Sequence, residues 1–431
     1  MATFPRGAVE RFVIERLGLT RGCKQLAGRI IESYEGDPED YTALFEHCFA
    51  MLDEICLAAT DAAAALEAEF YQLIREFSTG EAYDPVFESG YTSESVSESL
   101  HAFIKKYSEN KNFDALSGKM AQRVGMEIDH AIAYCAEENG KNDKREKKWA
   151  RVPGSPTPCT FCCMLASRGF DYSSYESARG KKGSHYGECK CTVMQGYEGM
   201  QVEGYDKDAY YRQWKKLEEI DKRDDLTDEE KDVLHLVAAD SEHKFNLEQS
   251  KELAERIGEI MSARQDAFLG ELTKTNYENT VEAWLKDVGK LYGMKISGEF
   301  LLGEKLYSAI PDGYEIWAAT RMRASWKEVQ FLGTDRRRKK GNPDLLVYGK
   351  YVDIKTPEND GRIARRVNQG ATQCKNRGQD EGIVLLSPLK LNGGYDKMVQ
   401  ISQERIDLGF ADRVYVIEVD SSVIPLDKAS G

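Results

Sequence analysis

The stretch that decides the fold of the C-terminal third lies at residues 342–355 and reads NPDLLVYGKYVDIK. Two short runs rich in apolar and aromatic residues flank Gly349-Lys350, a pattern typical of two strands joined by a tight hairpin turn. With a two-residue turn at that point, Asp344 lies opposite Lys355. Side chains two residues apart on a strand share a face, so Asp353 and Lys355 point the same way. The stretch therefore predicts one polar face that carries two carboxylates and an ammonium group.

This polar face has the residue types needed for metal-dependent phosphodiester cleavage. Carboxylates hold a hard divalent cation, and a positive group lies near the attacking water. Asp344 and Asp353 are the candidate metal ligands, and Lys355 is the candidate for orienting water or stabilising developing charge. Mg²⁺ is the expected metal, with Mn²⁺ or Zn²⁺ as alternatives. The competing interpretation is a solvated hairpin with an exposed ion pair.

The sequence around the hairpin predicts a small α/β domain over residues 280–431. The expected helices lie near 282–292, 300–310 and 362–375, and the expected strands at 314–318, 345–348, 351–355, 383–386 and 414–419.

Residues 341–357, GNPDLLVYGKYVDIKTP, resemble the restriction-endonuclease-like fold of PD-(D/E)xK nucleases. They are more closely similar to the C-terminal tRNase domain of contact-dependent growth inhibition toxins. The resemblance implies metal-assisted cleavage of RNA, with Asp344 and Asp353 as metal ligands and Lys355 at the scissile phosphate.

The same resemblance implies two further site residues. One is a glutamate on an upstream helix: Glu304, nine residues before Gly313, fits the family spacing best, followed by Glu299 and then Glu282. The other is a glutamine on the helix that follows the hairpin, which corresponds to Gln373 or, one turn earlier, Gln369.

The charge distribution adds a candidate nucleic-acid surface. The chain has a net charge of −14, but residues 311–380 hold 15 Lys and Arg against 9 Asp and Glu, so this window carries +6 and the rest −20. Cations gathered before and after the hairpin can bind a phosphate backbone without reading its sequence. The candidates are Arg336, Arg337, Arg338, Lys339, Lys340, Arg362, Arg365 and Arg366. Taken alone, the run at 336–340 is also typical of a solvated loop.

Five of the ten cysteines lie between residues 159 and 191. A C-x-x-C pair followed by a second Cys/His group is ligand spacing for a structural zinc. The expected ligands are Cys159, Cys162, His185 and either Cys189 or Cys191, with Cys163 as a spare buried thiol. The alternative is a set of reduced cysteines without metal.

Residues 151–191 resemble the minor head proteins of tailed phages of the MuF type. The matching elements are RVP at 151–153, the C-x-F-C pair, MLASRG at 164–169, a Tyr-Ser element, His185 and the final C-x-C. Three residues separate His185 from Cys189 where the family pattern has two. The resemblance implies a particle-associated protein near the portal, with no catalytic role for the head module.

These features predict a multidomain chain. A mainly α head module over 1–200 contains the Cys-rich motif at 149–197, a charged helical spacer follows over 201–279, and the α/β nuclease domain occupies 280–431. No apolar run is long enough for a membrane helix, and the first residues lack the apolar segment of a secretory signal. The chain is therefore expected in the cytoplasm of its producer, with no membrane partner.

Together the two resemblances predict a phage or prophage polymorphic toxin. It would travel with the virion and act in the cytoplasm of a target cell. Its expected partners are a tRNA or DNA substrate, phage portal or capsid proteins, and a cognate immunity protein. The alternatives are a DNase of the same fold, or a non-catalytic minor capsid protein that binds packaged DNA.

Overall fold

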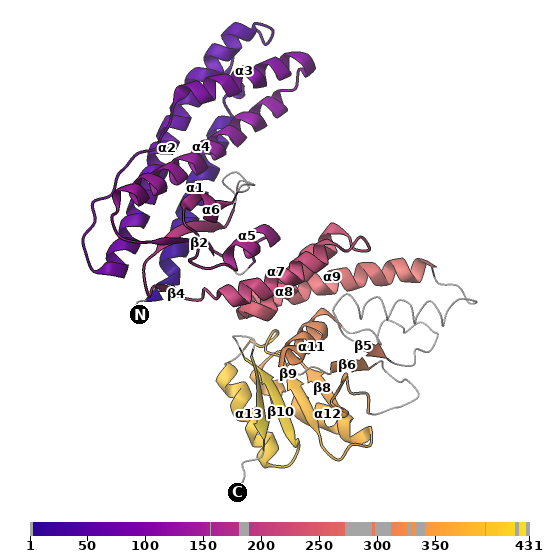
Figure 1. The fold of residues 1–431 in the computed structure, drawn as a ribbon. Helices are drawn as coiled ribbons and strands as arrows, with labels where there is room; N and C mark the ends of the chain where they lie inside the picture. The colour runs from indigo at the N-terminus through magenta and orange to yellow at the C-terminus, as the bar shows by residue number, and fades with distance from the viewer. Residues whose placement is uncertain are drawn as a thin grey trace. The chain divides into compact units, whose positions relative to one another are not determined.

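The structure is a computed structural model that describes residues 3–155, 157–180, 189–271, 295–297, 312–325, 329–332, 341–392, 394–418 and 422–427. The chain forms two compact units, Met1–Lys215 and Lys216–Gly431 (Figure 1). No helix in the described ranges is both long enough and apolar enough to cross a membrane.

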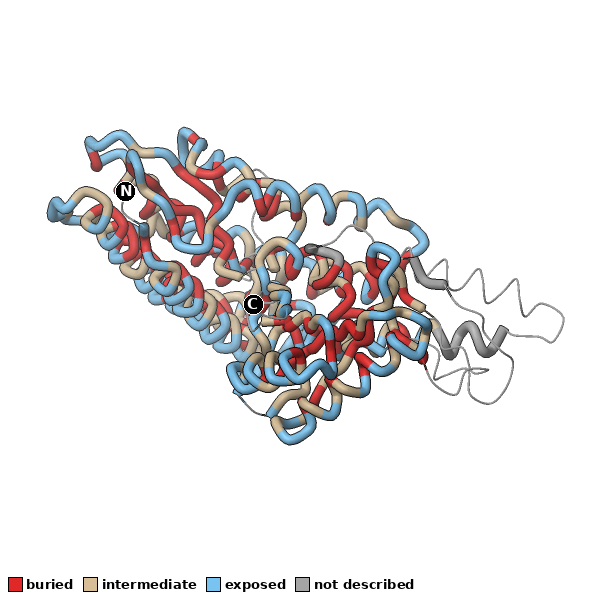
Figure 2. The backbone as a smooth tube through the Cα atoms, turned by 90° about the horizontal axis from the view of Figure 1, so that it is seen from below, coloured by how far each residue is buried: buried red, intermediate tan, exposed pale blue. Residues whose placement is uncertain are grey.

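The first unit is mainly helical, which confirms the prediction for the N-terminal region. It begins with a two-residue strand and then consists chiefly of four long helices. The elements are β1 (Thr3–Phe4), α1 (Arg6–Gly28), η1 (Ile31–Ser33), α2 (Tyr41–Thr79), α3 (Ser93–Asn110) and α4 (Phe113–Asn142). Asp40 and Asn112 define the starts of α2 and α4, because their side chains accept hydrogen bonds from backbone N–H groups three residues later. Figure 2 shows buried and exposed residues alternating along the long helices, as expected for helices that share one core.

The cysteine-bearing part of the first unit is built on a two-stranded antiparallel sheet. Its elements are β2 (Lys148–Pro153), α5 (Thr160–Ala166), α6 (Tyr175–Arg179), β3 (Cys191–Gly196), β4 (Gln201–Val202) and α7 (Lys207–Asp221). In the β2–β3 pair, Pro153 lies opposite Cys191 and Trp149 opposite Gln195. Strand β4 pairs with β1 in parallel.

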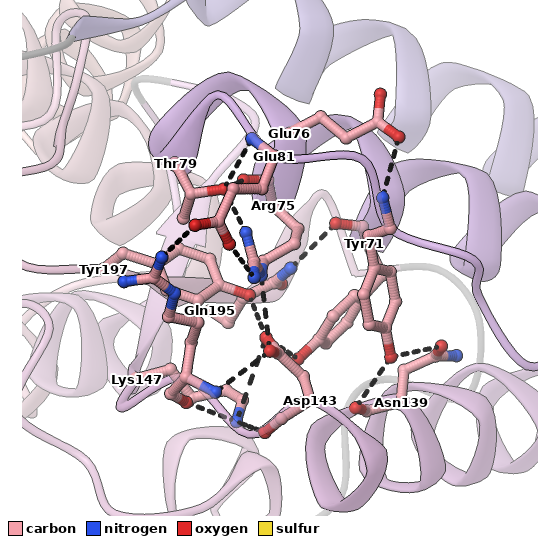
Figure 3. A network of polar contacts seen from close by, with 12 residues as sticks. Tyr71, Arg75, Glu76, Thr79, Glu81, Asn139, Asp143, Lys147, Gln195 and Tyr197 are labelled. Atoms are coloured by element: carbon pink, nitrogen blue, oxygen red, sulfur yellow. Dashed lines mark hydrogen bonds and ion pairs between the residues drawn. The ribbon is translucent and has the colours of Figure 1, made fainter.

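A buried polar network attaches this sheet to the helices, and its centre is the Asp143 carboxylate at the end of α4 (Figure 3). That carboxylate accepts hydrogen bonds from the hydroxyls of Tyr197 (2.7 Å) and Tyr71 (3.2 Å) and from Nε of Arg75 (3.3 Å). Gln195 on β3 donates to the backbone carbonyl of Tyr71 on α2 at 3.0 Å. Residues from α2, α4 and the segment around β3 are therefore held together through one carboxylate.

The second unit contains a seven-stranded mixed sheet with the order β11-β10-β9-β8-β7-β6-β5. Its strands are β5 (Lys295–Ser297), β6 (Val329–Leu332), β7 (Leu345–Val347), β8 (Lys350–Lys355), β9 (Ile383–Leu386), β10 (Arg413–Ile417) and β11 (Val423–Asp427). Its helices are α8 (Asp228–His243), α9 (Leu247–Glu271), α11 (Gly313–Ser325), α12 (Asp360–Asn376) and α13 (Tyr395–Asp407). Strands β8, β9 and β10 are parallel, with α12 and α13 as their crossover helices.

Helices cover both faces of this sheet, because the central strands carry apolar residues on both sides. Along β9, Ile383 and Leu385 pack with α8, α9 and α11, whereas Val384 and Leu386 pack with α12 and α13. A sheet-containing C-terminal region is thus confirmed.

Two features of the second unit differ from the sequence-based expectation. Residues 314–318 were predicted as a strand but lie inside helix α11. Helices α8 and α9 belong to the stretch expected as a charged spacer, yet Val233, Leu253 and Ile257 are buried in the core beneath the sheet. Most charged residues of α8 and α9 are exposed or half-buried, whereas Glu230 and Asp240 are buried and paired with Arg264 and Arg321, so these helices form part of the second unit.

Candidate functional site

The hairpin between β7 and β8 positions the polar side chains, with its turn one residue earlier than expected and its strand pairing therefore shifted by two residues. Tyr348 and Gly349 both have positive φ, 46° and 76°, and Val347 pairs with Lys350. Two consecutive positive φ angles are the signature of a type I′ turn, which favours glycine at its second central position. The turn is therefore Tyr348-Gly349, in place of the predicted Gly349-Lys350.

This register changes which residues face each other. Leu345 pairs with Val352, so the next position along places Asp344 across from Asp353, where Lys355 was expected. The Lys355 ammonium forms an ion pair with Oδ2 of Asp353 and lies 4.0 Å from Oδ2 of Asp344. Asp344 is further fixed by the backbone N–H of Ile354, which donates to its Oδ2 at 2.7 Å. The three predicted residues Asp344, Asp353 and Lys355 are thus brought together.

A fourth charged residue, Glu315, joins them and was not predicted from the sequence. It lies in the first turn of α11 and is coupled electrostatically to Asp344 and Lys355. Asp312 and Glu315 form a reciprocal pair at the start of this helix, with hydrogen bonds of 2.8 and 3.0 Å between each backbone N–H and the other side chain. An acidic cap followed three residues later by glutamate is a helix-start signal, so the sequence did carry a cue for this helix.

Burial and mutual repulsion shift the pKa values of the carboxylates upward. Burial, then the charges of Asp344 and Asp312, raises the pKa of Glu315 to about 8. Burial also raises the pKa of Asp344 and, together with Asp344, raises the pKa of Asp353 well above its usual range. Burial opposes the charge on Lys355, but Asp353 and Asp344 outweigh it and raise the pKa of that ammonium. Full ionisation would set three carboxylates against one ammonium, and this excess of negative charge contributes to the raised pKa values.

This donor set fits a divalent cation. The Asp353 side chain is fully buried, and within the described ranges its Oδ1 atom makes no hydrogen bond. A buried carboxylate oxygen without a partner is strongly unfavourable, and carboxylate oxygens are the ligands that Mg²⁺ and Mn²⁺ prefer. Asp344 and Asp353 are therefore chemically suited to hold such an ion, whereas the carboxylate oxygens of Asp344, Asp353 and Glu315 do not all lie within 4.8 Å of one another.

A groove of about 1040 Å³ runs beside Lys355 along helix α12. Its lining includes Arg365, Arg366 and the amide side chains Asn368, Gln369 and Gln373. The predicted residue Gln373 also braces the site, because its Oε1 accepts the backbone N–H of Asn342 at 3.1 Å, two residues before Asp344.

The predicted cations on α12 have different surroundings. Arg366 pairs with Glu358 at 2.8 Å, and Arg365 is exposed at the groove. Arg362 is exposed on the same helix and does not line the groove.

Several predicted residues lie outside the described residues. These are Glu304 with its alternatives Glu299 and Glu282, the basic run Arg336, Arg337, Arg338, Lys339 and Lys340, and the candidate zinc ligand His185.

In the first unit, the structure brings Cys162, Cys189 and Cys191 together as a buried cluster. Cys163 is also buried but lies apart from it, with its thiol directed at the carbonyl of Pro158 at 3.6 Å.

Comparison with known families bears on the first unit. Residues 7–217 match the model of a phage-associated family, and this match supports a phage protein with an N-terminal region of the phage-head type. The family is described as VG15 protein, and the match ends close to the boundary between the two units. No curated protein and no solved structure matches the chain.

Proposed function

We propose that this chain is a phage or prophage polymorphic toxin whose second unit is a PD-(D/E)xK-type, metal-dependent nuclease acting on tRNA. The observation that carries the proposal is the convergence of Asp344, Asp353 and Lys355 at one end of the β7–β8 hairpin, with Glu315 near enough for the charge of Asp344 to raise its pKa. A solvated hairpin with an exposed ion pair would leave these groups in water, whereas the Asp353 side chain is fully buried beside Lys355.

Each residue has a defined role in this proposal. Asp344 and Asp353 would hold a divalent cation, with Glu315 as the third carboxylate. Glu315 takes the role that the sequence resemblance assigned to Glu304. The cation supplies Lewis-acid activation of the phosphate and neutralises developing charge. Lys355 orients the attacking water through its ammonium and stabilises the negative charge that develops on the phosphoryl oxygens.

The groove beside Lys355 supports a nucleic-acid substrate. Arg365 is available to phosphate oxygens, and the amide groups of Asn368 and Gln369 can hydrogen-bond base or ribose atoms. The choice of tRNA over DNA rests on the sequence resemblance of the hairpin to the tRNase domain of contact-dependent growth inhibition toxins.

The first unit supports a route between cells. In this proposal the chain is synthesised in the producer's cytoplasm and joins the virion through portal or capsid proteins, a route that the phage-head-type match of residues 7–217 supports. The nuclease then acts in the cytoplasm of the target cell. A producer that survives such a toxin needs a cognate immunity protein, and an acidic one would complement the cations around the groove.

The test is nuclease activity of the purified full chain on tRNA, other RNA and DNA with Mg²⁺ or Mn²⁺. We expect tRNA cleavage that Asp344→Asn abolishes and that Glu381→Gln, a change to an exposed carboxylate in the same unit, leaves intact. Cleavage of DNA alone would establish the DNase alternative. Absence of any cleavage, with intact binding to phage particles, would leave a non-catalytic head protein.

A further inference from the structure

The cysteine cluster of the first unit has the geometry of a mononuclear metal site. The sulfurs of Cys162, Cys189 and Cys191 all lie within 4.8 Å of one another, and the Cys162 and Cys189 sulfurs are 3.5 Å apart. A disulfide would need about 2.05 Å. Four sulfurs placed about 2.3 Å from a tetrahedral zinc are separated by about 3.8 Å, close to the observed spacing.

A fourth cysteine is available to the same group. Cys159 precedes α5 as the first member of the C-x-x-C pair, and its thiol interacts with the Cys162 thiol. It is exposed, and its sulfur does not lie within 4.8 Å of all three clustered sulfurs. Cys189 and Cys191 come from the start of β3, so the two pairs approach from two separate segments of the chain. Cys163, which is directed toward Pro158, takes no part.

The charge around the cluster favours deprotonated cysteines that bind a metal cation over four neutral thiols. Arg151 on β2 is buried, with 3% exposure, and its Nη2 lies 3.0 Å from the Cys189 sulfur and 3.5 Å from the Cys162 sulfur. A buried guanidinium is stable only beside compensating negative charge, which thiolates supply. Four thiolates with one Zn²⁺ carry −2, and Arg151 offsets half of that charge.

A second arginine fixes the position of the cluster. Arg16 on α1 is buried, with 5% exposure, and donates through Nη2 to the backbone carbonyl of Cys189. Hydrogen bonds of this kind to and beside metal ligands orient them before the metal binds.

We propose that Cys159, Cys162, Cys189 and Cys191 bind one structural Zn²⁺ as a four-thiolate site, with Arg151 as its charge-compensating hydrogen-bond donor. His185 is not a ligand in this assignment. The site links α5 to the start of β3 and thereby cross-links two segments of the first unit that are far apart in the sequence. It is independent of the nuclease proposal.

The test is metal content and zinc X-ray absorption of the full chain, purified under reducing conditions and washed with a mild chelator. We expect one zinc per chain, with four sulfur neighbours at about 2.3 Å and no nitrogen. Co²⁺ exchange should give the intense visible bands of a tetrahedral thiolate complex. These measurements use the unaltered chain, so they do not depend on the folding of a variant.

Matched variants separate ligands from bystanders. Cys189→Ser should lower zinc retention by at least tenfold, while Cys163→Ser and His185→Ala should retain one zinc. A first shell of three sulfurs and one nitrogen, loss of zinc in His185→Ala, iron in place of zinc, or a Cys162–Cys189 disulfide in freshly reduced protein would each overturn the proposal. So would reduced thiols without metal.

Discussion

The most informative perturbation is Glu315→Gln, because it removes the negative charge of this side chain while leaving the shape of the side chain nearly unchanged. Glutamine can still accept the backbone N–H of Asp312, so the start of α11 is retained. Any effect on stability therefore reports on the charge of Glu315 among its neighbours.

The size and sign of the effect follow from its pKa. A glutamate titrates near 4.3 when unfolded, whereas burial and Asp344 raise the pKa of Glu315 to about 8 in the folded protein. The folded state thus binds this proton more tightly, and stability falls as pH rises from about 4 to about 8. Without metal, the loss above pH 8 is about 3–5 kcal/mol, and Glu315→Gln should recover most of it.

A divalent cation should stabilise the wild-type chain more than Glu315→Gln, which is the opposite of the order expected without metal. A ligand at 100 times its dissociation constant stabilises the folded state by about 2.7 kcal/mol, and the wild-type chain should gain this with Mg²⁺ or Mn²⁺ while the variant gains less. The assay is scanning calorimetry at pH 5 and pH 9, with EDTA or with metal. For a unit of this size each kcal/mol corresponds to about 2–4 °C in the midpoint.

The control is Glu381→Gln, which alters an exposed carboxylate paired with Lys350 at 2.6 Å and should change little under all four conditions. Failure of Glu315→Gln to stabilise the EDTA-treated protein at pH 9 would contradict a raised pKa of Glu315 in the folded protein. Equal metal-induced shifts in the variant and the wild type would contradict the proposed role of Glu315 in holding the cation.

Two further substitutions test the framework of each unit. Asp143→Asn should destabilise the first unit by about 3–5 kcal/mol in urea titrations, because it breaks a buried ion pair. Burial opposes ionisation of Asp143, but its hydrogen bonds outweigh burial and lower its pKa, so the wild-type advantage should be present above about pH 4 and vanish as pH falls through the lowered pKa. Gly370→Ala would place a Cβ 2.9 Å from Val384 and 3.0 Å from Oδ2 of Asp353, so it should cost about 1–3 kcal/mol and weaken the metal-induced shift. Gly361→Ala on the same helix meets only an ordinary contact of 3.4 Å and should be neutral or slightly stabilising, and equal effects of the two glycine substitutions would contradict the packing argument.

The parts of the second unit that the sequence predicted well are those in which local pattern and tertiary environment agree. Strand β9 is a short apolar run buried on both faces, and its predicted bounds, 383–386, are confirmed. Helix α12 has apolar residues at helical spacing, Ile363, Val367 and Ala371, and was predicted to within two residues at its start and one at its end.

The incorrect predictions for residues 314–318 and for the hairpin turn have physical causes. The run at 314–318 is rich in aromatic and apolar residues and short, so its periodicity cannot separate a strand from a helix buried in a core. Trp317 and Ala318 are both almost completely buried, which removes the alternation that would identify an exposed helix face. The hairpin turn lies one residue earlier than expected, which shifts the strand pairing by two residues, because Tyr348 adopts the first positive φ.

The strand predicted over 314–318 also concealed Glu315. This glutamate lies in the acidic first turn of α11, where the charge of Asp344 raises its pKa, whereas Glu304 lies outside the described residues. The corrected helix also changes the boundary of the proposed nuclease. A fragment that begins at residue 280 would lack α8 and α9, whose buried residues complete the core beneath the sheet.

The central claim is that the β7–β8 hairpin and Glu315 form a phosphodiester-cleaving site. It is tested most directly by sequencing the RNA ends produced when the purified full chain is incubated with total tRNA and Mg²⁺, in parallel with Asp344→Asn. We predict uniform new ends at one position of the tRNA substrate, present with the wild-type chain and absent with the variant. New ends that persist with Asp344→Asn, or no cleavage of RNA or DNA with any divalent metal tried, would contradict the claim.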